Sequence, residues 1–150
     1  MKIIKYFFQF LIISFLFFLF KILGYKYSSD LGSILGKYLG PFFRSKKVIM
    51  NNLKRVFPEF EIEEINILIK DMWSNYGRIL SDYIFIKDLR ISHFDKYIEI
   101  EGTDILKKIK DQNQPVIFVS GHFNNFELLA MSIEKSGIDL AAIYRPLNNI

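Results

Sequence analysis

A run of fifteen residues without a charge, Tyr6 to Phe20, restricts the fold of this chain more than any other feature. Two polar side chains, Gln9 and Ser14, interrupt apolar neighbours. Taken as Ile3–Leu23, the stretch contains two lysines whose aliphatic stems can lie along a helix. It is long enough to cross about 30 Å of hydrocarbon as a helix. We therefore predict a transmembrane or monotopic anchor helix over residues 1–24.

A cleaved signal peptide is the alternative interpretation of this segment. The stretch Lys21-Ile-Leu-Gly-Tyr-Lys26 lacks the small-x-small pattern of a cleavage site, and the apolar run is rich in bulky Phe. These features favour an uncleaved anchor. Lysines on both flanks leave its orientation open. A helix half-sunk in one leaflet fits the same pattern.

Charge is divided unevenly along the chain. Residues 1–55 carry ten Lys/Arg and one acid, Asp30, whereas residues 56–150 carry ten Lys/Arg and fifteen acids. Basic charge beside an apolar segment is attracted to an anionic membrane surface, by about 1 kcal/mol per nearby cation. Nucleic acid is the competing partner for such charge. Because no nucleic-acid motif accompanies it, we predict membrane lipids as partners and no nucleic acid.

The segment after the anchor is predicted to be helical. Residues 41–58 form a basic amphipathic pattern, which fits docking on lipid headgroups or a surface helix with a solvated charged side. Residues 59–86 begin with acids and continue with apolar residues at helical spacing. A spacing of four separates three glycines, a pattern of close helix packing or of a loose connector: Gly32, Gly36 and Gly40.

In the last third of the chain, short strands alternate with short helices. Residues 97–101, 116–120 and 140–144 have strand patterns, and helices are predicted at 105–111 and 126–136. This alternation is typical of βαβ units and a parallel sheet. The predicted fold class is α/β: an N-terminal anchor helix and a helical segment, then the start of a largely parallel βαβ sheet with flanking helices.

Three side chains are predicted to meet at one edge of that sheet. Ligands bind outside the carboxyl ends of parallel strands. His122 directly follows the second strand and Arg145 the third, while Glu127 lies in the first turn of the intervening helix. A neutral imidazole is a general base worth roughly 10²–10⁴-fold in rate. A carboxylate on its other nitrogen fixes the tautomer and stabilises the imidazolium.

Other chemistry is less well supported. Ser120 lacks the Gly-x-Ser-x-Gly elbow of a serine hydrolase, so the substrate has to supply the hydroxyl. The chain has no cysteine and only two histidines, and His93 is not placed near His122 by any pattern, so we predict neither a metal nor a cofactor. The plain alternative is a strand-capping His122 followed by a helix-start acid at Glu127.

Residues 120–128, Ser-Gly-His-Phe-Asn-Asn-Phe-Glu-Leu, resemble the His-x-x-x-x-Asp/Glu block of membrane acyltransferases. More specifically, they are similar to the Gly/Ala-His-Phe-Gly-Asn-Trp-Glu block of the bacterial lipid A biosynthesis acyltransferases, the lauroyl/myristoyl family. Three further stretches agree in order and spacing with that family's Asn-Leu…Phe-Pro, Val-Glu-Gly and Tyr-Arg-Pro blocks: Asn52–Pro58, Ile100–Gly102 and Tyr144–Pro146.

The chain departs from the family pattern in two residues and in length. Asn124 stands where the family usually has Gly or another small residue, and Phe126 stands where it has Trp. Family members are considerably longer than this chain. We therefore interpret residues 25–150 as the N-terminal part of an acyltransferase domain, truncated at its C-terminal side.

The resemblance implies acyl transfer from an acyl carrier protein thioester to a hydroxyl of an anionic glycolipid, the lipid A precursor. The catalytic domain would lie on the cytoplasmic face of the bacterial inner membrane. His122 would deprotonate the acceptor hydroxyl and Glu127 would orient the imidazole. Arg145 and Asn125 would bind substrate, with Arg145 holding a phosphate or offsetting charge on the thioester oxygen. No metal or cofactor is implied.

Two other functions fit parts of the sequence. A glycerolipid acyltransferase of the acylglycerol-phosphate type shares the His-x-x-x-x-acid pair, although its block usually ends in Asp where this chain has Glu127. A non-catalytic membrane-anchored module would use only the anchor and the basic helix. The second alternative predicts that His122 is dispensable.

Overall fold

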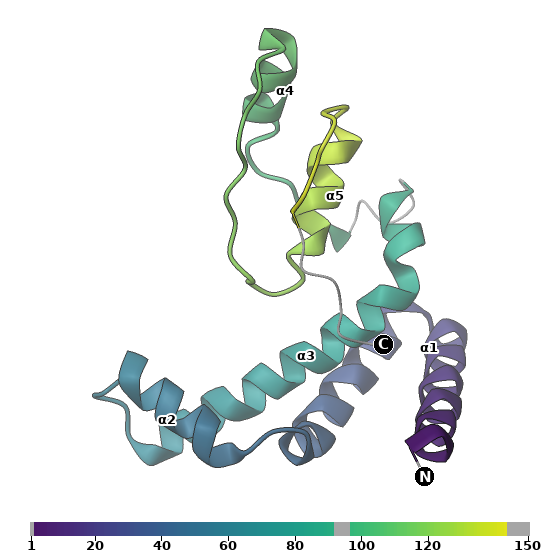
Figure 1. Cartoon of the computed structure of the whole chain (residues 1–150), viewed down its shortest axis with the longest axis vertical. Helices are drawn as coiled ribbons and strands as arrows, with labels where there is room; N and C mark the ends of the chain where they lie inside the picture. The colour runs from purple at the N-terminus through teal and green to yellow at the C-terminus, as the bar shows by residue number, and fades with distance from the viewer. Residues whose placement is uncertain (1, 92–96, 144–150) are drawn as a thin grey trace. The chain divides into compact units, whose positions relative to one another are not determined.

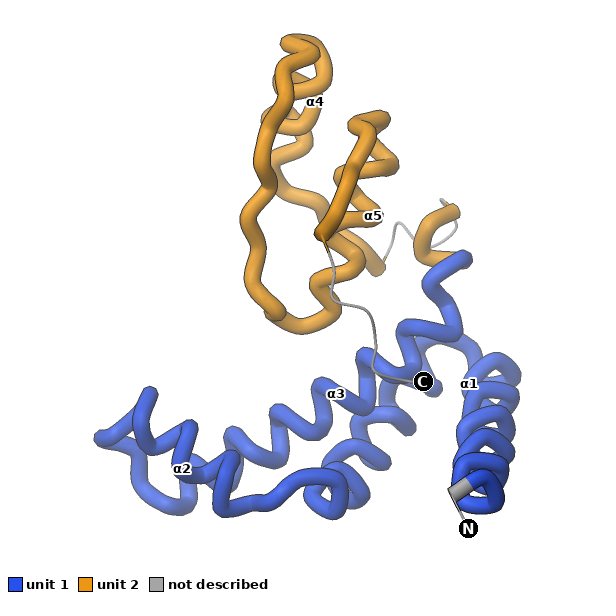
Figure 2. Tube along the Cα trace, viewed as in Figure 1, with its two compact units in different colours: residues 1–87 blue, residues 88–150 orange. Residues whose placement is uncertain are grey.

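The computed structural model describes residues 2–91 and 97–143, and these residues form helices and turns (Figure 1). The elements follow in the order α1 (Lys2–Leu39), the 3₁₀ turn η1 (Gly40–Phe42), α2 (Lys46–Val56), α3 (Ile62–Arg90), α4 (Thr103–Gln112) and α5 (Glu127–Lys135). Two compact units divide the chain, Met1–Lys87 and Asp88–Ile150, as Figure 2 shows.

The α/β prediction is wrong, because the described residues form no strand and no parallel sheet. Residues 97–101, 116–120 and 140–143 are irregular. Ile117 and Val119 are each 91% exposed, so the apolar run that was predicted to be a buried strand packs against almost nothing. A strand satisfies its backbone only through a neighbouring strand. The sequence pattern of each segment indicates only that its backbone prefers an extended conformation. The described residues contain no neighbouring strand with which it could pair.

The predicted helices are confirmed, with shifted boundaries. The helix predicted at 59–86 is α3, and those predicted at 105–111 and 126–136 are α4 and α5. The basic helix begins at Lys46 instead of Pro41, because residues 40–42 form the separate turn η1. Proline has no backbone N–H and fits the first turn of a helix, where that donor is unused.

Helix α1 consists of two pieces that meet at Gly24. This glycine has φ 76° and ψ 167°, a backbone conformation that is almost exclusive to glycine. The first piece contains the apolar run and is mostly exposed. By length and composition α1 is the helix in the described residues that can cross a membrane, and only 6% of its apolar window is buried. Most of the apolar piece of α1 therefore lies outside the core.

Both sides of the Gly24 junction contact the same residue of α3. The Lys21 ammonium lies 5.1 Å from the centre of the Phe85 ring, a cation–π distance. Tyr25 meets the same ring edge-on, with centroids 5.6 Å apart. Phe20, one turn before the junction, is fully buried. The end of the apolar piece is thus held against α3, although the rest of it is not.

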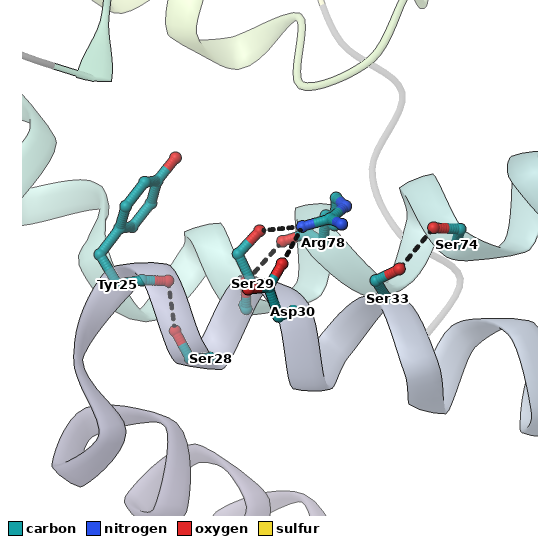
Figure 3. Close-up of polar contacts among 8 residues, drawn as sticks. Tyr25, Ser28, Ser29, Asp30, Ser33, Ser74 and Arg78 are labelled. Carbon is teal, nitrogen blue, oxygen red and sulfur yellow. Dashed lines mark hydrogen bonds and ion pairs between the residues drawn. The ribbon is translucent and has the colours of Figure 1, made fainter.

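The second piece of α1 packs side by side with α3 through small residues. A Cβ atom built on Gly32 would overlap the carbonyl oxygen of Gly77, and one built on Gly77 would overlap that of Gly32. A Cβ atom on Gly36 would meet the backbone of Trp73 in the same way. Ser33 Oγ and Ser74 Oγ, both buried, lie 2.6 Å apart between the helices (Figure 3). The close-packing interpretation of the glycine pattern is confirmed.

A polar cluster fixes the register of the same two helices. The Arg78 guanidinium donates from Nη1 to Ser29 Oγ and to Asp30 Oδ1, each at 3.0 Å (Figure 3). About half of each charged side chain is exposed to solvent. A pair of this kind contributes at most about 1 kcal/mol, so the cluster sets alignment more than stability.

Helix α2 packs against the N-terminal end of α3. Its one buried residue, Ile49, joins Ile65 and Ile69 in an apolar cluster. The cluster is completed by half-buried neighbours from α2, α3 and the connecting turn: Met50, Leu53, Phe60, Met72 and Trp73. Phe57 and Phe60 stack at 4.8 Å within that turn.

The backbone contact between α1 and α3 predicts the effect of Gly77→Ala. Alanine stabilises a helix more than glycine does, by up to about 1 kcal/mol. However, its methyl group would overlap Gly32, and overpacking costs about 1–3 kcal/mol. We expect a net loss of roughly 1–2 kcal/mol, read as a lower thermal midpoint by circular dichroism in neutral detergent. Asn51→Ala, at an exposed position of α2, is the control and should not lower the midpoint. A Gly77→Ala protein as stable as the parent would contradict the packing.

Candidate active site

The residues predicted to carry the chemistry lie where an irregular segment enters α5. A tight turn forms there, in which the Leu128 N–H donates to the Asn125 carbonyl oxygen at 3.1 Å and the Leu129 N–H donates to that of Phe126 at 3.1 Å. The helix that was predicted to follow His122 is therefore present. The strand that was predicted to precede it is absent, since residues 116–120 form no backbone pairing in the described chain.

Asn124 adopts a left-handed backbone conformation, with φ 50°. Most side chains avoid this region, which glycine enters freely and which asparagine tolerates best among the others. The position is the one where the resemblance leads us to expect glycine. The backbone requirement explains why asparagine is an acceptable replacement here, so the departure keeps the turn.

The His122 side chain is exposed and rests against an aromatic ring. Its imidazole and the Phe126 ring have centroids 4.5 Å apart and are tilted by 56°. Phe126 is the residue immediately before α5. An aromatic ring at the Trp position of the family block thus contacts the histidine and limits the directions in which the imidazole can point.

Glu127 is the first residue of α5 and is half-buried. A carboxylate in the first turn of a helix is favoured by the helix dipole. In the described part of the chain no hydrogen bond or ion pair joins Glu127 to His122. The structure places the two residues on the same turn but does not show the contact between imidazole and carboxylate that the sequence led us to predict.

The other predicted substrate-binding residues have different outcomes. Asn125 is half-buried in the turn between His122 and Glu127. Arg145 lies outside the described residues, as does His93, so their predicted roles stay predictions. Among the residues that the structure describes, no group of three or more His, Cys, Asp or Glu side chains can hold a metal ion.

Helix α5 is held in its unit on two sides. Arg90, at the end of α3, forms an ion pair with Glu134. Ile98 and Ile100 line a small hollow together with Met131 and Ser132 of α5. A larger cavity of about 520 Å³ lies between residues 109–118 and 137–141 of the same unit and includes neither His122 nor Glu127. This cavity is therefore not the site of the predicted chemistry.

The comparison with protein families decides what this block belongs to. The family model of the bacterial lipid A biosynthesis acyltransferases matches residues 1–150. The chain belongs to this family. The predicted resemblance is therefore confirmed over the whole length.

Curated proteins that are similar to this chain are named as lipid A biosynthesis enzymes. It is 30% identical over 130 residues to a lipid A biosynthesis palmitoleoyltransferase of Escherichia coli K12 and, to the same extent, to a lipid A biosynthesis acyltransferase of Shigella flexneri. Lipid A biosynthesis acyltransferase 2 of Shigella flexneri is 26% identical over 119 residues.

The matches cover the relatives only in part. The first two alignments take in 85% of this chain and 42% of the relative, and the third takes in 77% and 37%. The chain thus spans less than half the length of the curated relatives it matches. No solved structure gives a significant match.

The left-handed turn of this acyltransferase family chain predicts which residues position 124 accepts. Asn124→Gly should keep the turn, whereas Asn124→Val should cost about 1–2 kcal/mol, because a β-branched side chain is strained at positive φ. The difference can be measured as the rate of limited proteolysis around residues 120–127. Gln114→Val is the control for adding a β-branched side chain, because residue 114 is exposed and does not have a positive φ. Equal rates for Asn124→Gly and Asn124→Val would refute the turn.

Proposed function

We propose that this chain is the N-terminal part of an acyltransferase of lipid A assembly. In this proposal, a fatty acyl chain passes from an acyl carrier protein thioester to a hydroxyl of the lipid A precursor. The observation that carries the proposal is the family match over residues 1–150, with the His-x-x-x-x-Glu block at the start of α5. Domain roles follow from it: residues 1–24 as anchor, residues 25–150 as the N-terminal part of the acyltransferase domain.

His122 is assigned the role of general base. Its side chain is exposed, so an acceptor hydroxyl can reach the imidazole. As the imidazole takes the hydroxyl proton, the oxygen attacks the thioester carbonyl carbon and a tetrahedral intermediate forms. Collapse of that intermediate breaks the carbon–sulfur bond, and the imidazolium returns its proton to the leaving thiolate. The products are an ester and the free carrier thiol.

Glu127 is assigned a positioning role. Its carboxylate has no ion pair or hydrogen bond in the described part of the chain, so its negative charge is free to stabilise the imidazolium. The contact requires the Glu127 side chain to turn back along its own helix entrance. Catalytic hydrogen bonds often tighten only in the complex with substrate. Asn125, between the two residues, and Arg145 are assigned to substrate binding.

The proposed location is the cytoplasmic face of the bacterial inner membrane. The apolar piece of α1 is exposed and long enough to cross a bilayer. The following segment up to residue 55 is strongly basic, as expected beside anionic headgroups. The acceptor is itself a membrane lipid, so an anchored enzyme meets it by diffusion in two dimensions.

His122→Ala in the full protein tests the catalytic assignment. Loss of a general base should lower the acyl transfer rate by about 10²–10⁴-fold, measured with purified protein, an acyl carrier protein thioester and a lipid A precursor. Ser120→Ala is the matched control, two residues away, and should retain the parent rate because no serine nucleophile is involved. Normal transfer by the His122→Ala protein would contradict the assignment of His122 as general base.

An experiment in cells distinguishes the two enzymatic alternatives. Cells that lack the gene should make lipid A with one acyl chain fewer, and the parent gene but not the His122→Ala gene should restore it, as read by mass spectrometry. A glycerolipid acyltransferase would leave the acyl number unchanged and would instead transfer acyl chains to a lysophosphatidic acid acceptor.

A further inference from the structure

The helical unit Met1–Lys87 carries a groove that no step of acyl transfer uses. It consists of two adjoining hollows of about 420 and 350 Å³, which share Arg44, Ile49 and Trp73. We call it the basic groove. Its remaining lining residues come from the end of α1, the turn after it, α2 and α3: Lys37, Pro41, Lys46, Asn52, Leu53, Asn66, Ile69, Lys70, Met72 and Tyr76.

Positive charge gathers around the basic groove without a counterion. Lys37, Arg44, Lys46 and Lys70 line its larger hollow, and no carboxylate does. In the described part of the chain none of the four forms an ion pair. Arg78, by contrast, is paired with Asp30 on the same helical pair. Four unpaired cations around one hollow favour an anionic ligand.

Trp73 lines both hollows of the basic groove. Its indole N–H is buried and has no hydrogen-bond partner in the described chain. Buried Trp N–H groups usually find a partner, and leaving one unsatisfied costs about 1–3 kcal/mol. The ring packs where Gly40 has no side chain, since a Cβ atom there would overlap it.

The walls of the basic groove are apolar beneath the charges. Ile49 and Ile69 are buried members of the apolar cluster of the unit. Phe42 and Phe43 stand in sequence between two lining residues, Pro41 and Arg44, and are 85% and 82% exposed. Large exposed aromatic side chains beside cations are characteristic of a surface that enters the headgroup region of a membrane. The combination fits an amphiphile better than a free anion.

We propose that the basic groove binds the phosphate group of an anionic membrane phospholipid. The four cations surround the phosphate, and the first carbons of an acyl chain lie on the apolar wall. Phe42 and Phe43 enter the bilayer beside it. This gives the helical pair its own attachment to the membrane, separate from the apolar piece of α1 and independent of the acyl transfer proposed at His122.

The chain carries its own reporter for this site, because Trp73 is its only tryptophan. The whole chain, held in neutral maltoside micelles, is titrated with dihexanoyl phosphatidylglycerol while Trp73 fluorescence is recorded. We expect a saturable change. Dihexanoyl phosphatidylcholine, whose phosphate charge is compensated, should bind at least about tenfold more weakly, since the cations contribute about 1 kcal/mol each.

Paired substitutions identify the cations. Lys46→Gln with Lys70→Gln removes two charges from the rim and should weaken phosphatidylglycerol binding about thirtyfold. Lys37→Gln with Arg44→Gln is the second pair and decides the question if the first loses helix content by circular dichroism. Lys107→Gln with Lys108→Gln, on exposed positions of α4, is the matched control and should bind as the parent does.

Several results would overturn the proposal. These are equal binding by the two lipids, parent-like binding by both folded groove variants, and an equal loss in the α4 control. Inorganic phosphate that saturates the fluorescence change at the same concentration would indicate a site for a free anion. A tighter response to a single-stranded oligonucleotide would indicate nucleic acid. None of these readouts involves catalysis, so failure here leaves the acyl transfer proposal standing.

Discussion

Backbone-to-backbone contact between Gly32 and Gly77 is the constraint on which the helical unit depends. With no side chains in between, α1 and α3 approach closely enough for Ser33 and Ser74 to share a buried hydrogen bond. The same closeness brings Lys37 on α1 and Lys70 and Trp73 on α3 to one hollow. A wider helix pair would lose the polar contacts and separate the cations of the basic groove.

The proposed catalytic residues depend on local structure instead. His122, Asn125 and Glu127 lie within one turn, and the left-handed Asn124 is what lets the chain reverse into α5. Phe126 both precedes the helix and packs on the imidazole. The turn therefore carries an exposed histidine five residues before the first carboxylate of α5. This arrangement needs few long-range contacts, which is why a short motif can specify it.

The same distinction explains what could be predicted from the sequence. Helix periodicity depends on residues a few positions apart, and α3, α4 and α5 were predicted correctly. The glycine spacing left close helix packing and a loose connector open, and the structure shows close packing. The parallel sheet was predicted wrongly, because alternation at 97–101 describes one segment whereas a sheet needs a partner. The basic groove was not predicted. Its residues are separated in sequence, and only the pairing of α1 with α3 brings them together.

Gly24 has a consequence for how the apolar piece of α1 can vary among related chains. Among the described residues, no atom beyond its neighbours in the chain lies within 4 Å of the position of its missing side chain, so no packing contact there fixes the bend. The bend rests on two torsion angles of one residue and on the Phe85 ring that Lys21 and Tyr25 share. Changing those few groups would redirect the hydrophobic arm while the remaining helices kept their architecture. Here the direction of the apolar piece is a separately adjustable trait.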